Sequence, residues 1–448
     1  GDSGTAHSTG TNGAANGASA AAHSASPTAA APPPPVPGPA STAPPSQPPP
    51  DPDAWMRGLR YNDKGVITKD MGNAAILLRH TPEWAGVLCY NEFAQRIEFV
   101  RPPPPLLAFS PPAIGEVRDD HVVYMHHWLA KVRGVAFTKQ GVIDAMNQTA
   151  RSSPRHPVRE YLDGLKWDGV PRLGRWLSLY LGADDSEYTK AVGRWWMISA
   201  IARAYKPGCQ ADHVTILEGP QGAGKSCAVR ILAGPWYLGT LPELREKDAP
   251  DRLYGNWLVE VGELDAFKGA SISRIKDFVT MTEDVYRPAY GHFKERHLRS
   301  CIFIGTTNDS AYLRDPTGAR RFWPVKIQRL DREALTRDRD VLWAEAVQAY
   351  QDGADWWPSE DMRAAIEAQQ EARYEIDPWE ELISGWVTGE RVSMSDVLAH
   401  ALLLSPKDQS QAAQGRAAHI LRRLGYHRKT VREGEHVVRR WLRGGGEG

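Results

Sequence analysis

The sequence has no apolar run long enough to cross a membrane, and it has very little cysteine. No apolar stretch reaches the roughly 18 residues that a membrane span needs, so we expect no membrane partner. The four cysteines, Cys89, Cys209, Cys227 and Cys301, are far apart and form no C-x-x-C pair. This spacing argues against a disulfide scaffold and a zinc site, and it is typical of a reducing, cytoplasmic compartment.

Lys, Arg, Phe, Tyr and Trp are missing from the first 53 residues, which are almost entirely Ala, Pro, Ser, Gly and Thr. Such a composition cannot bury a core, so residues 1–53 are expected to form a disordered tether. The chain has 448 residues, 42% of them hydrophobic, and a net charge of zero. That length accommodates two or three domains, and the uneven distribution of charge matters more than its total.

Composition and hydrophobic period divide the remainder of the chain. Short strands with helices between them indicate an α/β sheet in the middle of the chain, and a basic, helix-rich segment follows. The expected regions are a small mixed α/β domain (54–150), a helical, collar-like region (151–207), an ATPase domain (208–330), a helical connector (331–377), a winged-helix-like domain (378–443) and a flexible tail (444–448).

The segment Gly219-Pro-Gln-Gly-Ala-Gly-Lys-Ser226 matches the phosphate-binding pattern G-x-x-x-x-G-K-[ST]. It follows the apolar run 214–217 and precedes a predicted helix over 227–232, as such a loop should. Glycines let backbone N–H groups surround phosphate oxygens, Lys225 adds a charge, and Ser226 offers its hydroxyl to Mg²⁺. We therefore predict ATP and Mg²⁺ as cofactors, held by Gly219, Pro220, Gln221, Gly222, Ala223, Gly224, Lys225, Ser226 and Cys227.

Two later strands end in polar residues that suit hydrolysis. The run 256–261 carries Glu260 and is followed by Glu263, and the run 300–305 is followed by Asn308. Hydrolysis needs an acid that organises Mg²⁺ and a group that orients water, and either glutamate could take either role. A solvated surface carboxylate is an equally good interpretation of Glu263. Asn308 suits a γ-phosphate sensor, although asparagine is also frequent in turns.

An arginine pair, Arg320 and Arg321, lies in a glycine-bearing loop before another apolar run. A guanidinium delivered to a neighbouring subunit's phosphate stabilises transition-state charge and couples hydrolysis to subunit contact. An ordinary surface pair is the alternative interpretation. The complete nucleotide-binding pattern just upstream favours the catalytic role.

Two basic segments are candidates for contact with DNA. Between the predicted acid and sensor strands, basic and aromatic residues alternate over 287–297, which suits backbone phosphates and stacked bases. The second segment, from Arg416 to Arg443, has nine Lys and Arg residues against two acids, the charge expected of a phosphate-binding surface. Solvated surfaces are the alternative in both places. The candidate DNA contacts are His292, Lys294, Arg422, Arg423, Arg428, Lys429, Arg439 and Arg440.

Several separated motifs resemble those of one known family. They are Tyr90-Asn-Glu-Phe93, His156-Pro-Val-Arg-Glu-Tyr-Leu162, Leu165-Lys-Trp-Asp-Gly-Val-Pro-Arg172, Pro207-Gly-Cys209, the phosphate loop, Glu260-Val-Gly-Glu-Leu-Asp265 and Gly318-Ala-Arg-Arg-Phe-Trp-Pro324. Together they resemble the virulence-associated protein E family of phage and mobile-element proteins, whose nucleotide domain is similar to superfamily 3 helicases.

This resemblance implies a fold: an AAA+-like, α/β P-loop NTPase core between a mixed N-terminal region and a winged-helix-like C-terminal domain. It implies roles for Lys225 and Ser226 on phosphate and Mg²⁺, for Glu260 as the first Walker B acid, for Asn308 as sensor, and for Arg320 or Arg321 as the trans-acting arginine. One departure is that Val261 follows Glu260 where many superfamily 3 proteins have a second acid. The catalytic base is therefore open between Glu260 and Glu263.

The resemblance further implies an ATP-dependent DNA motor, a replicative helicase working in the cytoplasm of a bacterial host. Its expected partners are single-stranded or forked DNA, five further copies of the chain in a hexamer, and a primase upstream. Two alternatives stay open: a DNA-binding or origin-recognition switch that ATP controls with little unwinding, and a nucleotide or small-molecule kinase. The kinase is disfavoured because the basic C-terminus and the arginine pair have no evident use in it.

Overall fold

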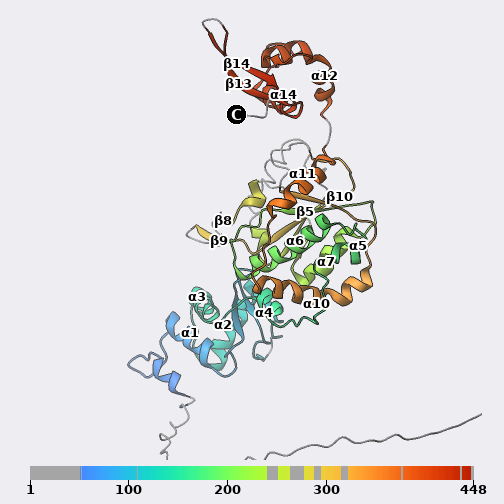
Figure 1. Ribbon diagram of the computed structural model, residues 1–448. Coiled ribbons are helices and arrows are strands. Elements are labelled where there is room, and N and C mark those ends of the chain that lie inside the picture. The colour runs from blue at the N-terminus through green and yellow to red at the C-terminus, as the bar shows by residue number, and fades with distance from the viewer. Residues whose placement is uncertain are drawn as a thin grey trace, which may run out of the picture. The chain divides into compact units, whose positions relative to one another are not determined.

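The computed structural model describes residues 51, 53–107, 109–239, 251–262, 277–286, 294–313, 321–374, 377–433 and 436–444. Nearly all of the expected tether and tail therefore lie outside the described residues. Figure 1 shows the elements in chain order, beginning with a 3₁₀ turn at Ala54–Gly58. Within the described ranges, no helix combines the length and apolarity needed to cross a membrane.

A small mixed sheet with helices forms the N-terminal region. Its strand order is β3-β2-β1-β4, with β1 antiparallel to β2 and parallel to β4. A separate hydrophobic core, which includes Trp84, Phe99 and Trp128, joins the sheet to its helices. The elements are α1 (Met71–His80), β1 (Leu88–Asn91), β2 (Arg96–Phe99), β3 (Gly115–Glu116), α2 (Asp119–Val132), α3 (Lys139–Arg151) and β4 (Pro154–Arg155).

The centre of the chain is a parallel sheet of order β11-β5-β10-β7-β6. Its three inner strands are entirely buried, because their side chains meet hydrophobic clusters on both faces. Burial on both faces is why these strands appear as continuous apolar runs in the sequence. The strands are β5 (Val214–Glu218), β6 (Tyr237–Leu238), β7 (Leu258–Val261), β10 (Ile302–Thr307) and β11 (Phe322–Lys326).

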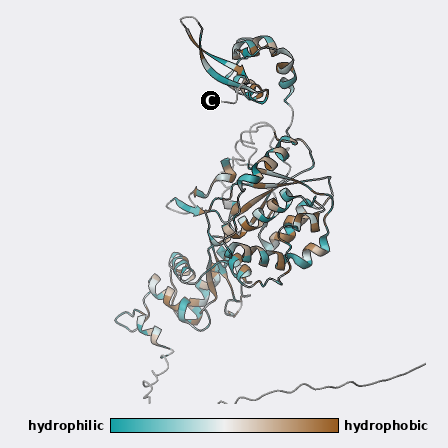
Figure 2. Ribbon diagram, in the orientation of Figure 1, coloured by the Kyte–Doolittle hydropathy of each residue, from teal (hydrophilic) through white to brown (hydrophobic). Residues whose placement is uncertain are grey.

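One face of this sheet is covered by helices α6, α7 and α10; α6 and α7 contact the strands, and α10 contacts α6 and α7. Side chains cap two of these helices: Ser186 accepts from the Thr189 N–H, and Asp331 accepts from the Ala334 N–H. Figure 2 shows hydrophobic residues concentrated on the central strands and on the inner sides of the helices. The helices are α4 (Pro157–Asp163), α5 (Trp176–Leu181), α6 (Glu187–Tyr205), α7 (Lys225–Ala233), α10 (Arg332–Gln351) and α11 (Arg363–Glu371).

Smaller elements complete this central part. A two-stranded antiparallel hairpin, β8 (Glu283–Tyr286) and β9 (Glu295–Leu298), lies in the chain between β7 and β10. Short 3₁₀ turns occupy Gly234–Trp236, Asp251–Leu253 and Glu360–Met362. The hairpin falls in the segment where basic and aromatic residues alternate, and its tip, 287–293, lies outside the described residues.

The C-terminal region has its own core and a three-stranded antiparallel sheet of order β12-β14-β13. Tyr426 and Trp441 anchor the long hairpin to helix α14 through that core. The elements are α12 (Pro378–Trp386), β12 (Arg391–Val392), α13 (Met394–Asp396) continuing into a π-helical turn at Val397–Ala401, α14 (Gln411–Arg423), β13 (Tyr426–Glu433) and β14 (His436–Arg443).

The mixed α/β architecture with a parallel sheet is the one expected from the sequence, but one detail differs. The expected connector contains α10, whose Leu335, Leu342 and Trp343 are fully buried in the central core rather than spanning solvent. Its charged residues cover the outer face of the helix and hide this role in the sequence. Trp167 is 40% exposed, whereas the nearby Trp176, Trp195 and Trp196 are buried.

Candidate nucleotide-binding site

The glycine-rich loop leads from the carboxyl end of β5 directly into α7. Gly222 and Gly224 have φ values of +84° and +90°, a conformation that favours glycine. A Cβ at Gly224 would also lie 2.6 Å from the Cβ of Leu330. Leu330 in turn donates its N–H to the Ala223 carbonyl at 3.0 Å. Both backbone conformation and space therefore require the second glycine at this position.

Lys225 begins α7, and its ammonium group is directed back into the loop. Nζ donates to the carbonyls of Gly219 and Pro220 at 2.6 and 3.0 Å, and to Oδ1 of Asn308 at 2.8 Å. Burial lowers the pKa of Lys225, and the nearby Glu260 carboxylate opposes that effect. A buried ammonium held by three neutral oxygens is able to exchange them for phosphate oxygens. The structure thus brings together the predicted lysine and sensor asparagine, 83 residues apart in the chain.

Glu260 lies next to this lysine and is only 2% exposed. Strand β7 places it on the α7 side of the sheet, beside β10. Its Oε1 accepts the hydroxyls of Ser226 at 2.6 Å and Thr306 at 2.8 Å, and its Oε2 accepts the hydroxyl of Tyr237. The serine predicted to bind Mg²⁺ and the predicted Walker B acid are therefore in direct contact.

The donor set at this point fits a hard divalent cation with a triphosphate. Carboxylate and hydroxyl oxygens are ligands that Mg²⁺ accepts, and Mg²⁺ takes few protein ligands because phosphates and waters supply the rest. The N-terminus of α7, with Gly222 and Gly224 leaving room for backbone N–H groups, fits the phosphate part. Ser226 and Glu260 are the residues that would hold the metal, and the loop 219–227 would hold the nucleotide.

Two site residues were not predicted from the sequence. Thr306 stands two positions before Asn308, and the strand that carries the asparagine also directs this hydroxyl at Glu260. Tyr237 comes from the edge strand β6, and the guanidinium of Arg230 lies 5.2 Å from its ring centroid. Burial and the hydrogen bond to Glu260 raise the pKa of Tyr237, so it remains a donor. No motif marks Tyr237, because only the pairing of β6 with β7 brings it to the site.

A second buried carboxylate stands immediately before the loop. Glu218 accepts Nε and Nη2 of Arg373 at 2.8 and 2.9 Å and the hydroxyl of Tyr312 at 2.6 Å. Val214 and Ile216, which share its side of β5, belong to the hydrophobic cluster on the face away from α7. Glu218 and Glu260 therefore lie near the same edge of the sheet but on opposite faces.

Three predicted site residues, Glu263, Arg320 and His292, lie outside the described residues. Arg321 is described, and it precedes β11 at the amino edge of the sheet, where its carbonyl accepts the Val214 N–H at 2.8 Å. Since β11 pairs with β5 over its whole length, Arg321 is separated from its own loop by about five residues of strand, or about 16 Å. It is therefore not brought to the nucleotide site of its own chain.

The predicted DNA contacts are divided among three surfaces. Lys294 is exposed and directly precedes β9. In the C-terminal hairpin, Arg428 and Arg439 share the face of the buried Trp441, over whose ring Arg422 lies at 5.5 Å. Lys429 and Arg440 are paired across the two strands on the opposite face.

Arg423 has a different environment from the other basic candidates. It forms ion pairs with Glu371 at 3.0 Å and Glu380 at 3.3 Å, and its guanidinium lies 3.6 Å from the ring centroid of Tyr374. These ion pairs favour a structural role for Arg423. Its contact with DNA stays a prediction.

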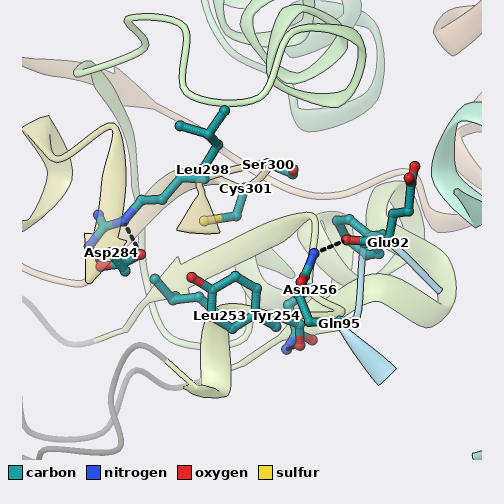
Figure 3. A pocket seen from close by; sticks show the side chains of 11 residues that line it. Glu92, Gln95, Leu253, Tyr254, Asn256, Asp284, Leu298, Ser300 and Cys301 are labelled. Atoms are coloured by element: carbon teal, nitrogen blue, oxygen red, sulfur yellow. Dashed lines mark hydrogen bonds and ion pairs between the residues drawn. The ribbon is translucent and has the colours of Figure 1, made fainter. Parts of the chain in front are cut away.

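A pocket lies away from this site, at the base of the β8–β9 hairpin (Figure 3). Its lining includes Glu92, Gln95, Asn256, Asp284 and Arg299. Its cavity of about 20 Å³ has room for about one water molecule. It is therefore not a second nucleotide site.

Comparison with known proteins identifies the class of the central region. Residues 162–375 match the model of the virulence-associated protein E-like domain. The chain thus carries a domain of this family, which confirms the resemblance found in the sequence. The quoted motif at 90–93 and most of that at 156–162 lie upstream of the matched range. A search of curated protein sequences finds no significant match.

Among solved structures, the chain is similar to apo structures of the NrS-1 C-terminal region. Two of them, in the span 305–718, give TM-scores of 0.39 and 0.40 at 12% identity. A third gives 0.41 at 13% identity. Each alignment covers 80% of this chain and 96% of the other. Identities this low do not transfer a function.

Proposed function

We propose that this chain is an ATP-dependent DNA motor that serves the replication of a phage or mobile element, working as a helicase. The observation that carries the proposal is the convergence of three separate motifs: Lys225 contacts Asn308, and Ser226 contacts Glu260, at one end of a parallel sheet. Ligands of open α/β sheets bind at the carboxyl ends of the strands, where these residues lie. The virulence-associated protein E-like domain supports a role in a mobile element.

The chain's own groups have clear tasks in hydrolysis. Mg²⁺ and ATP, when bound, supply the reactive phosphoanhydride and its charge compensation. Lys225 exchanges the carbonyls of Gly219 and Pro220 for phosphate oxygens, and Asn308 keeps its Nζ aligned. Ser226 and Glu260 hold the metal, with Tyr237 and Thr306 fixing the carboxylate. We assign the polarisation of water to Glu263, because Glu260 already accepts three hydrogen bonds.

The arginine pair supports assembly of several copies. Arg321 is remote from the loop of its own chain, as its position at the amino edge of β11 shows. An arginine in that place can stabilise transition-state charge only in another subunit's site. We therefore propose a ring, with six copies as the working number, in which Arg320 or Arg321 completes the neighbouring site.

DNA is the proposed substrate along which the motor moves. Lys294 at the β8–β9 hairpin, together with His292, would contact a strand in the channel of the ring. The C-terminal region, in which three helical segments precede a hairpin, is proposed to act as a winged helix. Its candidate contacts are Arg422, Arg428, Lys429, Arg439 and Arg440.

The proposal is tested by strand displacement on a forked duplex with ATP and Mg²⁺, alongside hydrolysis with and without single-stranded DNA. We expect unwinding and DNA-stimulated hydrolysis, both lost in Lys225→Ala. Arg321→Ala should lose hydrolysis but keep nucleotide binding, because its target is another subunit's site. DNA binding without strand separation would favour the ATP-controlled DNA-binding switch over the motor. Hydrolysis that does not respond to DNA would contradict the motor.

A further inference from the structure

A buried ion pair lies at the base of the β8–β9 hairpin. Arg299, between β9 and β10, donates from Nε and Nη2 to the two carboxylate oxygens of Asp284 in β8, each at 2.7 Å. The two side chains are 1% and 4% exposed. Its Nη1 donates to the Phe278 carbonyl, and the guanidinium lies 4.3 Å from the Phe278 ring centroid. A two-point pair of this kind fixes orientation as well as charge.

The backbone of Arg299 is tied to the body of the domain as well. Its N–H donates to the Thr282 carbonyl at 2.9 Å, and its carbonyl accepts the Gly208 N–H at 2.9 Å. Nη1 of Arg203, near the end of α6, also donates to that carbonyl at 3.3 Å. Figure 3 shows Asp284 among the side chains that line the small pocket. Helix α6, the hairpin and the start of β10 thus meet at one residue.

The same strand reaches the nucleotide site. Arg299 stands three positions before β10 (Ile302–Thr307), whose far end supplies Thr306 to Glu260 and leads to Asn308 beside Lys225. Strand β10 is buried throughout and paired on both sides, with β5 and β7. A strand held on both edges does not bend independently of its sheet. A movement of the loop 219–226 can therefore be transmitted through the rigid strand β10 to Arg299.

We propose that the Arg299–Asp284 pair is the joint that makes the β8–β9 hairpin follow the nucleotide state of the site. This inference rests on the proposed function, in which the hairpin contacts DNA. Neither residue touches nucleotide or DNA, so both are positioning residues. A need for stability alone would be met as well by apolar residues of similar volume, which often replace buried ion pairs without loss.

The test is amide hydrogen exchange across 283–286 and 295–298, with and without Mg²⁺ and a non-hydrolysable ATP analogue. In the wild-type chain, we expect the analogue to slow exchange in the hairpin. Arg299→Met/Asp284→Leu replaces the ion pair by apolar side chains and should abolish this response, while thermal stabilisation by the analogue persists. Arg299→Lys, which keeps the charge but loses the two-point geometry, should weaken the response.

A matched control lies on the same hairpin. Arg296 and Glu283 form a 3.4 Å pair with side chains 75% and 36% exposed, and Arg296→Gln/Glu283→Gln should leave the response intact. In parallel, DNA stimulation of hydrolysis should fall about fivefold or more in the Met/Leu variant, the scale of ordinary coupling between sites. Basal hydrolysis should change less than about twofold, because no residue of the nucleotide site is altered.

Each outcome decides between the two proposals. Analogue binding that leaves wild-type hairpin exchange unchanged overturns the joint, as does a response that survives in the Met/Leu variant. If that variant fails to fold, the comparison of Arg299→Lys with the Arg296 and Glu283 control decides instead. If DNA does not stimulate hydrolysis by the wild-type chain, the proposed motor function is wrong. A nucleotide response that is lost in the Met/Leu variant still supports the joint.

Discussion

Glu260 and Glu218 are two buried carboxylates near the same edge of the same sheet, and their surroundings differ in one respect. In the described part of the chain, Glu260 accepts hydrogen bonds from three neutral hydroxyls. Glu218 accepts a guanidinium, that of Arg373, together with one hydroxyl. Hydroxyls orient a carboxylate without neutralising it, whereas the arginine compensates its charge. The first arrangement suits a cation that binds and dissociates, and the second suits a permanent structural ion pair.

The largest expected effect is the loss of stability when Arg373, the partner of Glu218, is replaced. Arg373→Met leaves Glu218 buried without its cation and should lower the free energy of unfolding by about 3–5 kcal/mol. Urea denaturation measures this change. Arg363→Met is the matched control, because its pair with Glu360 is exposed and is expected to contribute about 1 kcal/mol or less. Equal losses in the two variants would contradict a structural role for Glu218.

Glu260→Gln should act on hydrolysis instead of stability. Removing the charge while keeping the shape should lower kcat by about 10²–10³-fold, as for the loss of one charge-stabilising group. The amide oxygen can still accept from Ser226 and Thr306, and the Tyr237 hydroxyl can turn to accept from the amide N–H, so the fold should persist. ATP hydrolysis and urea denaturation are measured on the same sample. A variant that keeps near-normal kcat would show that Glu260 does not hold the metal.

A smaller effect is expected from one of the hydroxyls. Tyr237→Phe removes a single hydrogen bond to the Glu260 carboxylate, worth about 1.5–3 kcal/mol, and should raise the Mg²⁺ concentration for half-maximal activity about tenfold or more. Nucleotide binding without metal, followed by fluorescence of a labelled ADP, should be unchanged. Tyr205→Phe is the control, since its hydroxyl donates to Asp163 at 2.5 Å, remote from the site. A shift of the same size in the control would assign the effect to general packing.

The smallest expected effect concerns two basic residues of the C-terminal region, Lys429 and the ion-paired Arg423. Lys429→Ala should reduce the slope of log affinity against log salt by about 0.7–0.9 on DNA, the change for one phosphate contact. Arg423→Ala should leave that slope unchanged and lower stability, because Arg423 is paired with Glu371 and Glu380. Fluorescence anisotropy at several salt concentrations measures the slope. A lower slope in Arg423→Ala would show that it contacts DNA.

Much of this site follows from the sequence, for identifiable reasons. The loop 219–226 is recognised because each residue has a local task, and Glu260 and Asn308 are recognised because parallel strands present their ends at one edge. The contacts of Lys225 with Asn308 and of Ser226 with Glu260 agree with those expectations. Tyr237, Thr306 and Arg373 could not be selected in this way, because their tasks depend on neighbours distant in the chain.

The sequence by itself determined the mixed α/β class, the glycine-rich loop 219–226 between a strand and a helix, and the virulence-associated protein E resemblance, because all three depend on local spacing and hydrophobic period. The tertiary structure alone decided that α10 belongs to the core, that Arg321 is remote from its own loop, and that Arg423 is neutralised. It also decided which of two glutamates meets hydroxyls and which meets an arginine. Those properties arise from strand order and packing, which join residues that no local pattern relates.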